Sequence, residues 1–302
     1  MDYQQLLLAL LPDLLVVVAL FAALGVDYSR MRGSRLAKRY EGACRISAAG
    51  LIAGLAVVVL QIAGTMPVME SNADGQLVLN TGTLTLKALL YAMGLGVLPL
   101  AKRDHITPQV SEYFALLLLA TLGMGFMVTS RNLLGAFVAL ELVSLSLYAL
   151  TALNPARKES AEAALKYFTY GGIASAFLLF GISYLFGTLG RLDITQATLA
   201  EAPRLVVVAY LFIFVGLGFK LALAPFHVWA PDGDQAAPTP AAAWIAVKLV
   251  QPSAGDGNDE SRDPAASALN GPALPPPDGK VGAAIPGDDS VDVTGGGGGV
   301  EP

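Results

Sequence analysis

The sequence predicts an all-α membrane protein, a polytopic helix bundle with about seven or eight transmembrane helices. Hydrophobic residues make up 54% of the 302 residues and charged residues only 14%, which is a low charged fraction for a soluble domain of this length. The mean hydropathy is positive, at +0.58. Apolar runs close to twenty residues recur along the chain, and each can cross about 30 Å of hydrocarbon as a helix.

The first apolar run is predicted to be a retained membrane helix and not a cleaved signal peptide. It carries the acids Asp2 and Asp13, no basic region precedes it, and many further spans follow. The predicted spans, in chain order, are Leu6 to Val26, Ile46 to Gly64, Leu84 to Ala101, Tyr113 to Val128, Leu133 to Leu153, Ala161 to Gly187, and Leu205 to Ala224.

Basic residues alternate between the connections in a way that predicts the orientation of the chain. The first connection, between the first two spans, is rich in them: Arg30, Arg32, Arg35, Lys38, Arg39 and Arg45. The second connection has no Lys or Arg, and the connections on the side of the first hold most of the remainder. Because Lys and Arg collect in cytoplasmic loops, we expect the first connection inside and the N-terminus outside.

The fifth and sixth predicted spans carry ionisable residues. Glu141 lies near the middle of the fifth, where an exposed charge costs at least about 3 kcal/mol, so its carboxylate must face protein or water. Lys166 lies about a turn and a half into the sixth, where a lysine can also extend its side chain to the membrane surface. Gly171, Gly172 and the small residues Ser175 and Ala176 follow, and small residues permit close contact between helices.

The stretch GLGFKLALAPFHVWAPDGDQAAPTP, residues 216–240, combines a deep charge with a helix break. Lys220 lies some fifteen residues, or roughly 22 Å, into an apolar run, which is too deep for a surface lysine. Pro225 removes a backbone donor, so we expect the seventh helix to break or kink there, and His227 follows at once. A histidine beside a helix break either caps free backbone groups or relays protons, because the ordinary pKa of histidine is close to neutral pH.

The chain changes character near residue 250. An eighth apolar segment from about Ala236 to Val250 is too short to span alone. From Gln251 the sequence is rich in Gly, Pro and Asp and has no aromatic residue, which predicts disorder. We therefore divide the chain into an incomplete transmembrane domain, residues 1–250, and a disordered tail, residues 251–302.

Other residues exclude some kinds of site. The single cysteine, Cys44, excludes an intrachain disulfide, iron–sulfur clusters and metal sites with several thiolates. Lys87 and His105 lie near the ends of predicted spans, where anchoring at the membrane interface is the expected role. No metal site and no nucleic-acid partner is expected.

Three segments together resemble subunit N of bacterial NADH:quinone oxidoreductase, the respiratory complex I subunit known as subunit 2 in mitochondria. They are SEYFALLLLATLGMGFMVTSRNLLGAFVALELVSLSLYALTAL, SAEAALKYFTYGGIASAFLLFGISYLFGTLG, and the stretch 216–240 quoted above. The resemblance covers about residues 5 to 248. The central carboxylate, the central lysine and the A-P-T-P turn are shared with larger antiporter-like relatives of this subunit.

The resemblance implies a membrane-arm subunit of a proton translocase in the bacterial inner membrane, surrounded by lipid and by other membrane-arm subunits. NADH, FMN, iron–sulfur clusters and quinone would be bound by those other subunits, with no redox cofactor on this chain. By position, the proton-translocating residues would be Glu141, its partner Lys220, a second lysine Lys166, the bridging imidazole His227, and Lys248 of the following helix. A carboxylate close to Lys220 favours its protonated form, and separating the two favours proton release.

The family builds its channel from two inverted five-helix repeats, and this chain resembles only the first, with a broken seventh helix. Our hypothesis is that a frameshift or a mis-called gene end after about residue 248 introduced the Gly/Pro/Asp tail. Reading the encoding DNA in the other frames downstream of codon 248 tests it, because the hypothesis requires membrane sequence to continue there.

Two other functions remain open from the sequence. A stand-alone cation/proton antiporter would use the same buried charges without a redox partner. An inactive fragment would lack quinone reductase activity in a strain carrying only this gene copy. Co-purification with flavin and iron–sulfur subunits favours the translocase subunit, and ion exchange by the isolated protein in vesicles favours the antiporter.

Overall fold

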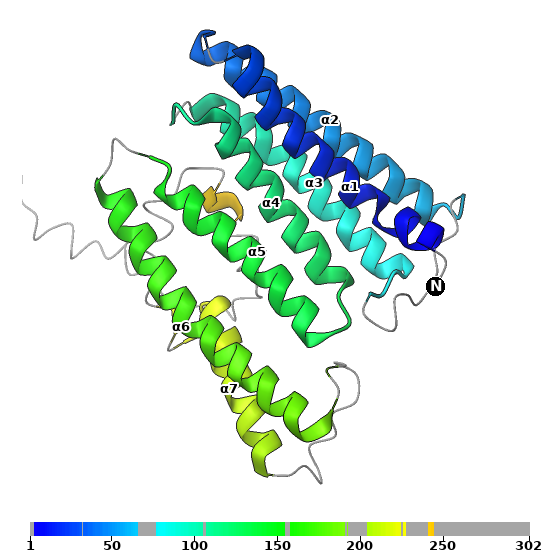
Figure 1. Ribbon diagram of the computed structural model, residues 1–302, viewed down its shortest axis with the longest axis vertical. Coiled ribbons are helices and arrows are strands. Elements are labelled where there is room, and N and C mark those ends of the chain that lie inside the picture. The colour runs from blue at the N-terminus through cyan, green and yellow to red at the C-terminus, as the bar shows by residue number, and fades with distance from the viewer. Residues whose placement is uncertain are drawn as a thin grey trace, which may run out of the picture. The chain divides into compact units, whose positions relative to one another are not determined.

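Figure 1 shows a computed structural model of the chain. The structure describes residues 3–31, 33–65, 77–104, 107–154, 158–190, 192, 204–224, 226–227 and 241–244. Packing divides the chain into two units, residues 1–251 and 252–302, and all described residues belong to the first.

The described residues are almost entirely helical, which confirms the predicted all-α membrane fold. The helices are α1 (Tyr3–Val26), continued by a π-helical turn η1 (Asp27–Met31), α2 (Leu36–Ile62), α3 (Thr81–Asp104), α4 (Val110–Thr129), α5 (Leu133–Ala152), α6 (Lys158–Leu189) and α7 (Arg204–Lys220). Six of them, α1 to α6, are long and apolar enough to cross a membrane. Because α7 has only 17 residues, the predicted number of spans stays a prediction.

The first four helices form one group, in which α1 packs against both α2 and α4, and α3 packs against α2 and α4 (Figure 1). The fifth helix packs on α4, α6 packs on α5, and α7 packs on α6. The larger of two apolar clusters of the described residues is built mainly from α1–α5 and also includes Tyr167 of α6 and Trp244, and the smaller joins α5, α6 and α7. Helix α5 packs against both α4 and α6 and so links α6 and α7 to the first four helices.

Small residues bring α6 and α7 into close contact. A Cβ atom placed on Gly181 would lie 2.7 Å from the Ala209 carbonyl oxygen, and one on Gly216 would lie 2.8 Å from the Ala174 carbonyl oxygen. Only glycine fits at both positions. The two backbones approach because their crossing points have no side chains, a common arrangement in membrane helix pairs.

The outward faces of the helices carry large apolar side chains. Phe21 is 67% exposed on α1, Leu165 is 65% exposed on α6, and Phe214 is 61% exposed on α7. A soluble protein rarely exposes apolar surface on this scale, whereas a membrane-spanning helix does so ordinarily.

Helix α1 contains a proline whose missing backbone bond is replaced by a side chain. Pro12 has no N–H group, so it cannot donate to the Leu8 carbonyl one turn earlier. The Gln61 amide, from α2, donates to that Leu8 oxygen at 2.9 Å. This interhelical bond joins the start of α1 to the end of α2 and satisfies a backbone group that has no water available in the membrane.

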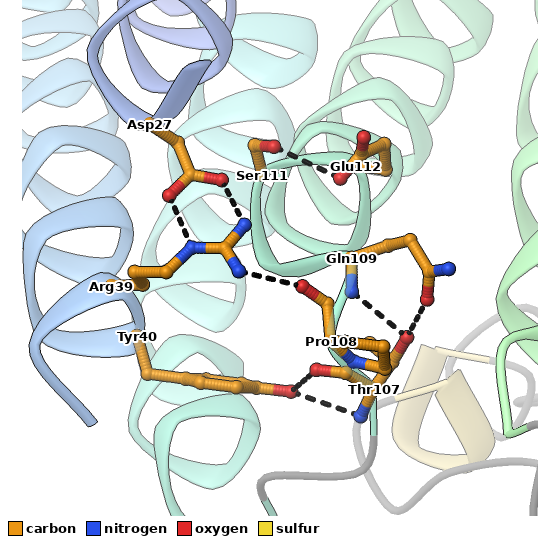
Figure 2. A network of polar contacts seen from close by, with 8 residues as sticks. All are labelled: Asp27, Arg39, Tyr40, Thr107, Pro108, Gln109, Ser111 and Glu112. Carbon is orange, nitrogen blue, oxygen red and sulfur yellow. Dashed lines mark hydrogen bonds and ion pairs between the residues drawn. The ribbon is translucent and has the colours of Figure 1, made fainter. Parts of the chain in front are cut away.

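Polar contacts join three segments at the other end of α1 (Figure 2). Arg39 of α2 makes paired hydrogen bonds to both carboxylate oxygens of Asp27, at 2.7 and 2.6 Å, and a third to the Pro108 carbonyl at 3.0 Å. The Tyr40 hydroxyl donates to the Thr107 carbonyl at 3.0 Å. The residues that lead into α4 are thereby fixed to the start of α2, and Arg39 joins both to Asp27.

Candidate functional site

Glu141 of α5 and Lys220, the last residue of α7, form an ion pair. Lys220 Nζ lies 2.8 Å from Glu141 Oε1, and the two side chains are 2% and 23% exposed. Both charges belong to apolar helices, which meet at this point because each packs against α6. A buried charge requires a partner, and each of these residues supplies it to the other.

Lys220 has two further hydrogen-bond acceptors, both on α5. Its Nζ donates to Ser144 Oγ at 3.0 Å and to Tyr148 Oη at 3.3 Å. With Glu141, these bonds use all the donors of a protonated lysine, so the geometry fits the charged form. A helix repeats every 3.6 residues, so residues three and seven places after Glu141 share its face, and this spacing is the sequence signal for Ser144 and Tyr148 that our sequence analysis missed.

Helix α6 supplies a hydrogen bond to the carboxylate. The Ser175 hydroxyl donates to Glu141 Oε1, the oxygen that also accepts from Lys220, at 2.5 Å. Sequence analysis noted Ser175 only as a small residue for helix contact. Nothing in the spacing along α6 identifies it as a partner of Glu141, because the bond depends on how α6 packs on α5.

Gly171 makes room for Tyr148. A Cβ atom on Gly171 would lie 1.8 Å from Tyr148 Oη, so no larger residue fits while the tyrosine keeps its position. Gly172, its neighbour, has open space where a Cβ would be. The predicted packing role of the small residues therefore applies to Gly171 and Ser175, which are buried, whereas Gly172 and Ala176 are exposed.

Helix α7 ends directly after Lys220 in a defined cap. The Leu223 N–H donates to the Gly218 carbonyl at 2.8 Å, and the Ala222 N–H donates to the Phe219 carbonyl at 3.0 Å. These are the two bonds of a Schellman motif, in which Ala222, at φ 51°, occupies the left-handed position usually held by glycine. The helix thus ends five residues before Pro225, and the predicted break at that proline stays a prediction.

The other predicted site residues are exposed or lie outside the described residues. Lys166 is on the exposed side of α6, where its Nζ lies 2.9 Å from Glu162 Oε1 one turn away. His227 is exposed in the turns that follow α7. Lys248 and His105 lie outside the described residues.

Lys87 does not have the interfacial position expected of it. It is 1% exposed, and its Nζ lies 2.6 Å from Asp13 Oδ2 of α1. The expectation was wrong because the sequence places Lys87 near a helix end but does not show that a carboxylate of another helix faces it. The membrane domain therefore contains a second buried ion pair.

Comparison with known proteins gives one consistent relationship. Residues 130–254 match a family described as NADH:quinone oxidoreductase/Mrp antiporter, transmembrane. NADH-quinone oxidoreductase subunit N 2 of Acidobacterium capsulatum is 43% identical over 256 residues, which cover 81% of this chain and 51% of that relative. The chain thus spans about half the length of the curated relative it matches.

Solved structures agree with this relationship. A chain of respiratory complex I from Thermus thermophilus, in a structure with bound aureothin, is 30% identical with a TM-score of 0.63, and the match covers 79% of this chain and 52% of the other. A chain of the Mrp complex from Dietzia sp. is 22% identical with a TM-score of 0.60, and the match covers 80% of this chain and 46% of the other. The second likeness shows the fold alone.

Proposed function

We propose that this chain, which is similar to subunit N of bacterial NADH-quinone oxidoreductase, moves protons through the membrane arm of such a complex. The Glu141–Lys220 pair carries the proposal. It lies within residues 130–254, the segment that matches the family. Intramembrane ionisable residues are rare and typically mark ion or proton pathways.

The proposed mechanism is an electrostatic switch. While Glu141 and Lys220 are in contact, the carboxylate holds the lysine proton by an attraction of roughly 4 kcal/mol at about 4 Å and an effective dielectric of 20. When the two separate, a lysine surrounded by apolar groups favours its neutral form, and the proton leaves. Ser144 and Tyr148 remain as neutral hydrogen-bond partners of the amine.

The end of α7 is suited to such a movement. Lys220 is the last helical residue, and Ala222 holds a left-handed conformation that costs a non-glycine residue about 1–2 kcal/mol. Residues at the ends of elements commonly absorb the backbone rotation when a protein changes conformation. A rearrangement of the cap would move Lys220 relative to Glu141 while α5 stays in place.

The proposal assigns the redox chemistry to other subunits. NADH oxidation, FMN, iron–sulfur clusters and quinone reduction belong to partner chains of the complex, and this chain supplies only the proton path. The proposed location is the bacterial inner membrane, with the N-terminus outside. Lys166, His227 and Lys248 are proposed as further groups on the path, which requires that conformational change or partner subunits connect them to the Glu141–Lys220 pair.

The test is proton translocation by the assembled complex in inverted membrane vesicles. We expect Lys220→Ala and Glu141→Gln each to lower the proton uptake per NADH oxidised. Lys102→Ala, which removes an exposed lysine at the end of α3, is the matched control and should leave uptake at the parent level. If both site variants pump like the parent, the assigned roles are wrong.

A second candidate is ion exchange without redox chemistry, as in an antiporter. The family that matches residues 130–254 is described as including Mrp antiporters, which favours it. Vesicles containing only the purified chain and an imposed sodium or potassium gradient would distinguish the two. Proton movement driven by the gradient alone supports the antiporter, and proton movement that requires NADH and the partner subunits supports the translocase.

A further inference from the structure

We propose that Asp13 and Lys87, with the Tyr91 hydroxyl, form a second proton-binding site inside the membrane domain. It is built by α1 and α3, outside the segment that matches the antiporter family, and uses neither Glu141 nor Lys220. Its existence as a proton-binding site is independent of the function proposed above. Its contribution to pumping rests on that function.

The geometry is that of a closed polar cluster. Lys87 and Asp13 are 1% and 2% exposed. Lys87 Nζ donates to Asp13 Oδ2 at 2.6 Å, and Tyr91 Oη donates to Asp13 Oδ1 at 2.7 Å. Both carboxylate oxygens are therefore bonded, and the lysine nitrogen also lies 5.8 Å from the centre of the Phe126 ring.

The position of the pair makes a purely structural role costly. Lys87 lies about 9 Å from the start of α3, within the reach of a snorkelling lysine, yet its side chain turns inward to α1. Asp13 lies about 15 Å from the start of α1. Burying two charges costs several kcal/mol for each, and apolar side chains of similar volume hold helices together at least as well.

The short contact allows the proton to be held by either partner. With the proton on nitrogen the pair is ammonium and carboxylate, and with the proton on oxygen it is amine and carboxylic acid. Both forms are neutral overall, so the pair can accept one further proton, which leaves ammonium beside carboxylic acid. Tyr91 donates to Asp13 Oδ1, the carboxylate oxygen that does not contact Lys87.

The groups described around Asp13 and Lys87 are mostly uncharged. Among the hydrogen bonds, ion pairs and ring contacts of the described residues, Asp13 and Lys87 meet one further titratable group, the Tyr91 hydroxyl. All three residues belong to α1 or α3. Helix α4 contributes the Phe126 ring and Gly125. Helix α2 contributes Gly54, beside the Tyr91 ring.

A double variant separates proton binding from structural support. Asp13→Asn or Lys87→Met alone leaves one buried charge without its partner, so we expect less folded chain in the membrane. The double variant has no charge at the site, so we expect it to restore the amount of folded chain. We also expect it to lose proton translocation per NADH oxidised. If the double variant pumps like the parent, the pair takes no part in pumping.

Infrared spectroscopy of the purified chain in lipid tests proton binding without the complex. We expect a protonated-carboxyl band that grows as the pH falls, shifts in deuterium oxide, and is absent from the Asp13→Asn/Lys87→Met double variant. Gly125→Ala retains all three polar groups and places a methyl group 3.5 Å from Lys87 Cε and 3.8 Å from Asp13 Oδ1, so it should shift the pH at which the band grows. A carboxylate that stays ionised over the whole range in which the chain remains folded overturns the proposal.

The two proposals fail in different ways. If Glu141→Gln and Lys220→Ala abolish pumping while the Asp13 band never titrates, this site is structural and the proposed function stands. If the Asp13 band titrates while those two variants pump like the parent, the proton-binding site stands and the proposed function is wrong.

Discussion

Gly171 is the residue at which one added methyl group would disturb the candidate site most directly. In Gly171→Ala the new Cβ would lie 1.8 Å from Tyr148 Oη and 2.6 Å from Cζ, so the ring must leave the position in which it accepts a hydrogen bond from Lys220. Overpacking of this kind costs about 1–3 kcal/mol. We expect a lower midpoint of thermal unfolding in detergent micelles and weaker proton translocation.

The neighbouring glycine provides the matched control for that prediction. Gly172→Ala meets no atom within 4 Å, and replacing a helical glycine by alanine stabilises a helix by up to about 1 kcal/mol. We expect this variant to unfold at the parent midpoint or above. Equal midpoints for the two variants would show that Tyr148 does not depend on Gly171.

The role of a single residue could be predicted from the sequence only where that role depends on its own helix. A carboxylate in the middle of an apolar helix needs a partner, so the sequence identifies Glu141 as a residue that must be satisfied. Ser144 and Tyr148 share its helix face and could have been found by spacing. Ser175 and the Lys87–Asp13 pair could not, because these contacts are set by how different helices pack.

At the scale of elements, hydropathy located the helices but not their ends. The predicted span Leu205 to Ala224 corresponds to α7, which ends at Lys220 because two backbone hydrogen bonds close a cap there. Hydropathy does not register such a cap, because the residues on either side of it are equally apolar. Helix α6 likewise extends beyond its predicted span at both ends, to Lys158 and Leu189.

The Pro12–Gln61 arrangement gives a prediction at this scale. Gln61→Leu leaves the Leu8 carbonyl, which Pro12 cannot bond, without a donor. The interhelical bond is worth about 0.6 kcal/mol on average and up to about 1.7 kcal/mol, and we expect the upper part of that range because the oxygen has no helical donor. In the Pro12→Ala background residue 12 again donates to Leu8, so Gln61→Leu should cost less.

A double-mutant cycle measures the difference. The free energy of unfolding would be determined in mixed micelles for the parent, both single variants and the double variant. We expect Gln61→Leu to be less destabilising in the presence of Pro12→Ala. Additive effects would mean that the Gln61 bond stabilises α1 and α2 without regard to the proline.

At the scale of the whole molecule, the enrichment of Lys and Arg in alternate connections predicts which side of the membrane each helix end faces. Helix packing alone does not predict this. The two ends of α2 must lie on opposite sides of the membrane if the helix crosses it. Ser34 precedes α2 and is exposed, and Ala63 follows it and is exposed. The basic residues near the start of α2 predict that Ser34 is inside and Ala63 outside, which corresponds to an N-terminus outside.

Cysteine labelling distinguishes the two orientations, because Cys44 is the single cysteine of the chain and can be replaced. In a Cys44→Ala background, a membrane-impermeant maleimide added to spheroplasts should label Ala63→Cys and leave Ser34→Cys unlabelled. Inverted vesicles should give the reverse pattern, and detergent should expose both positions. If Ser34→Cys is the one labelled in spheroplasts, the N-terminus is inside. Asp13 and Lys87, which lie nearer the N-terminal ends of α1 and α3, would then be nearer the cytoplasmic side, and any proton they exchange would come from the opposite side to the one the basic residues indicate.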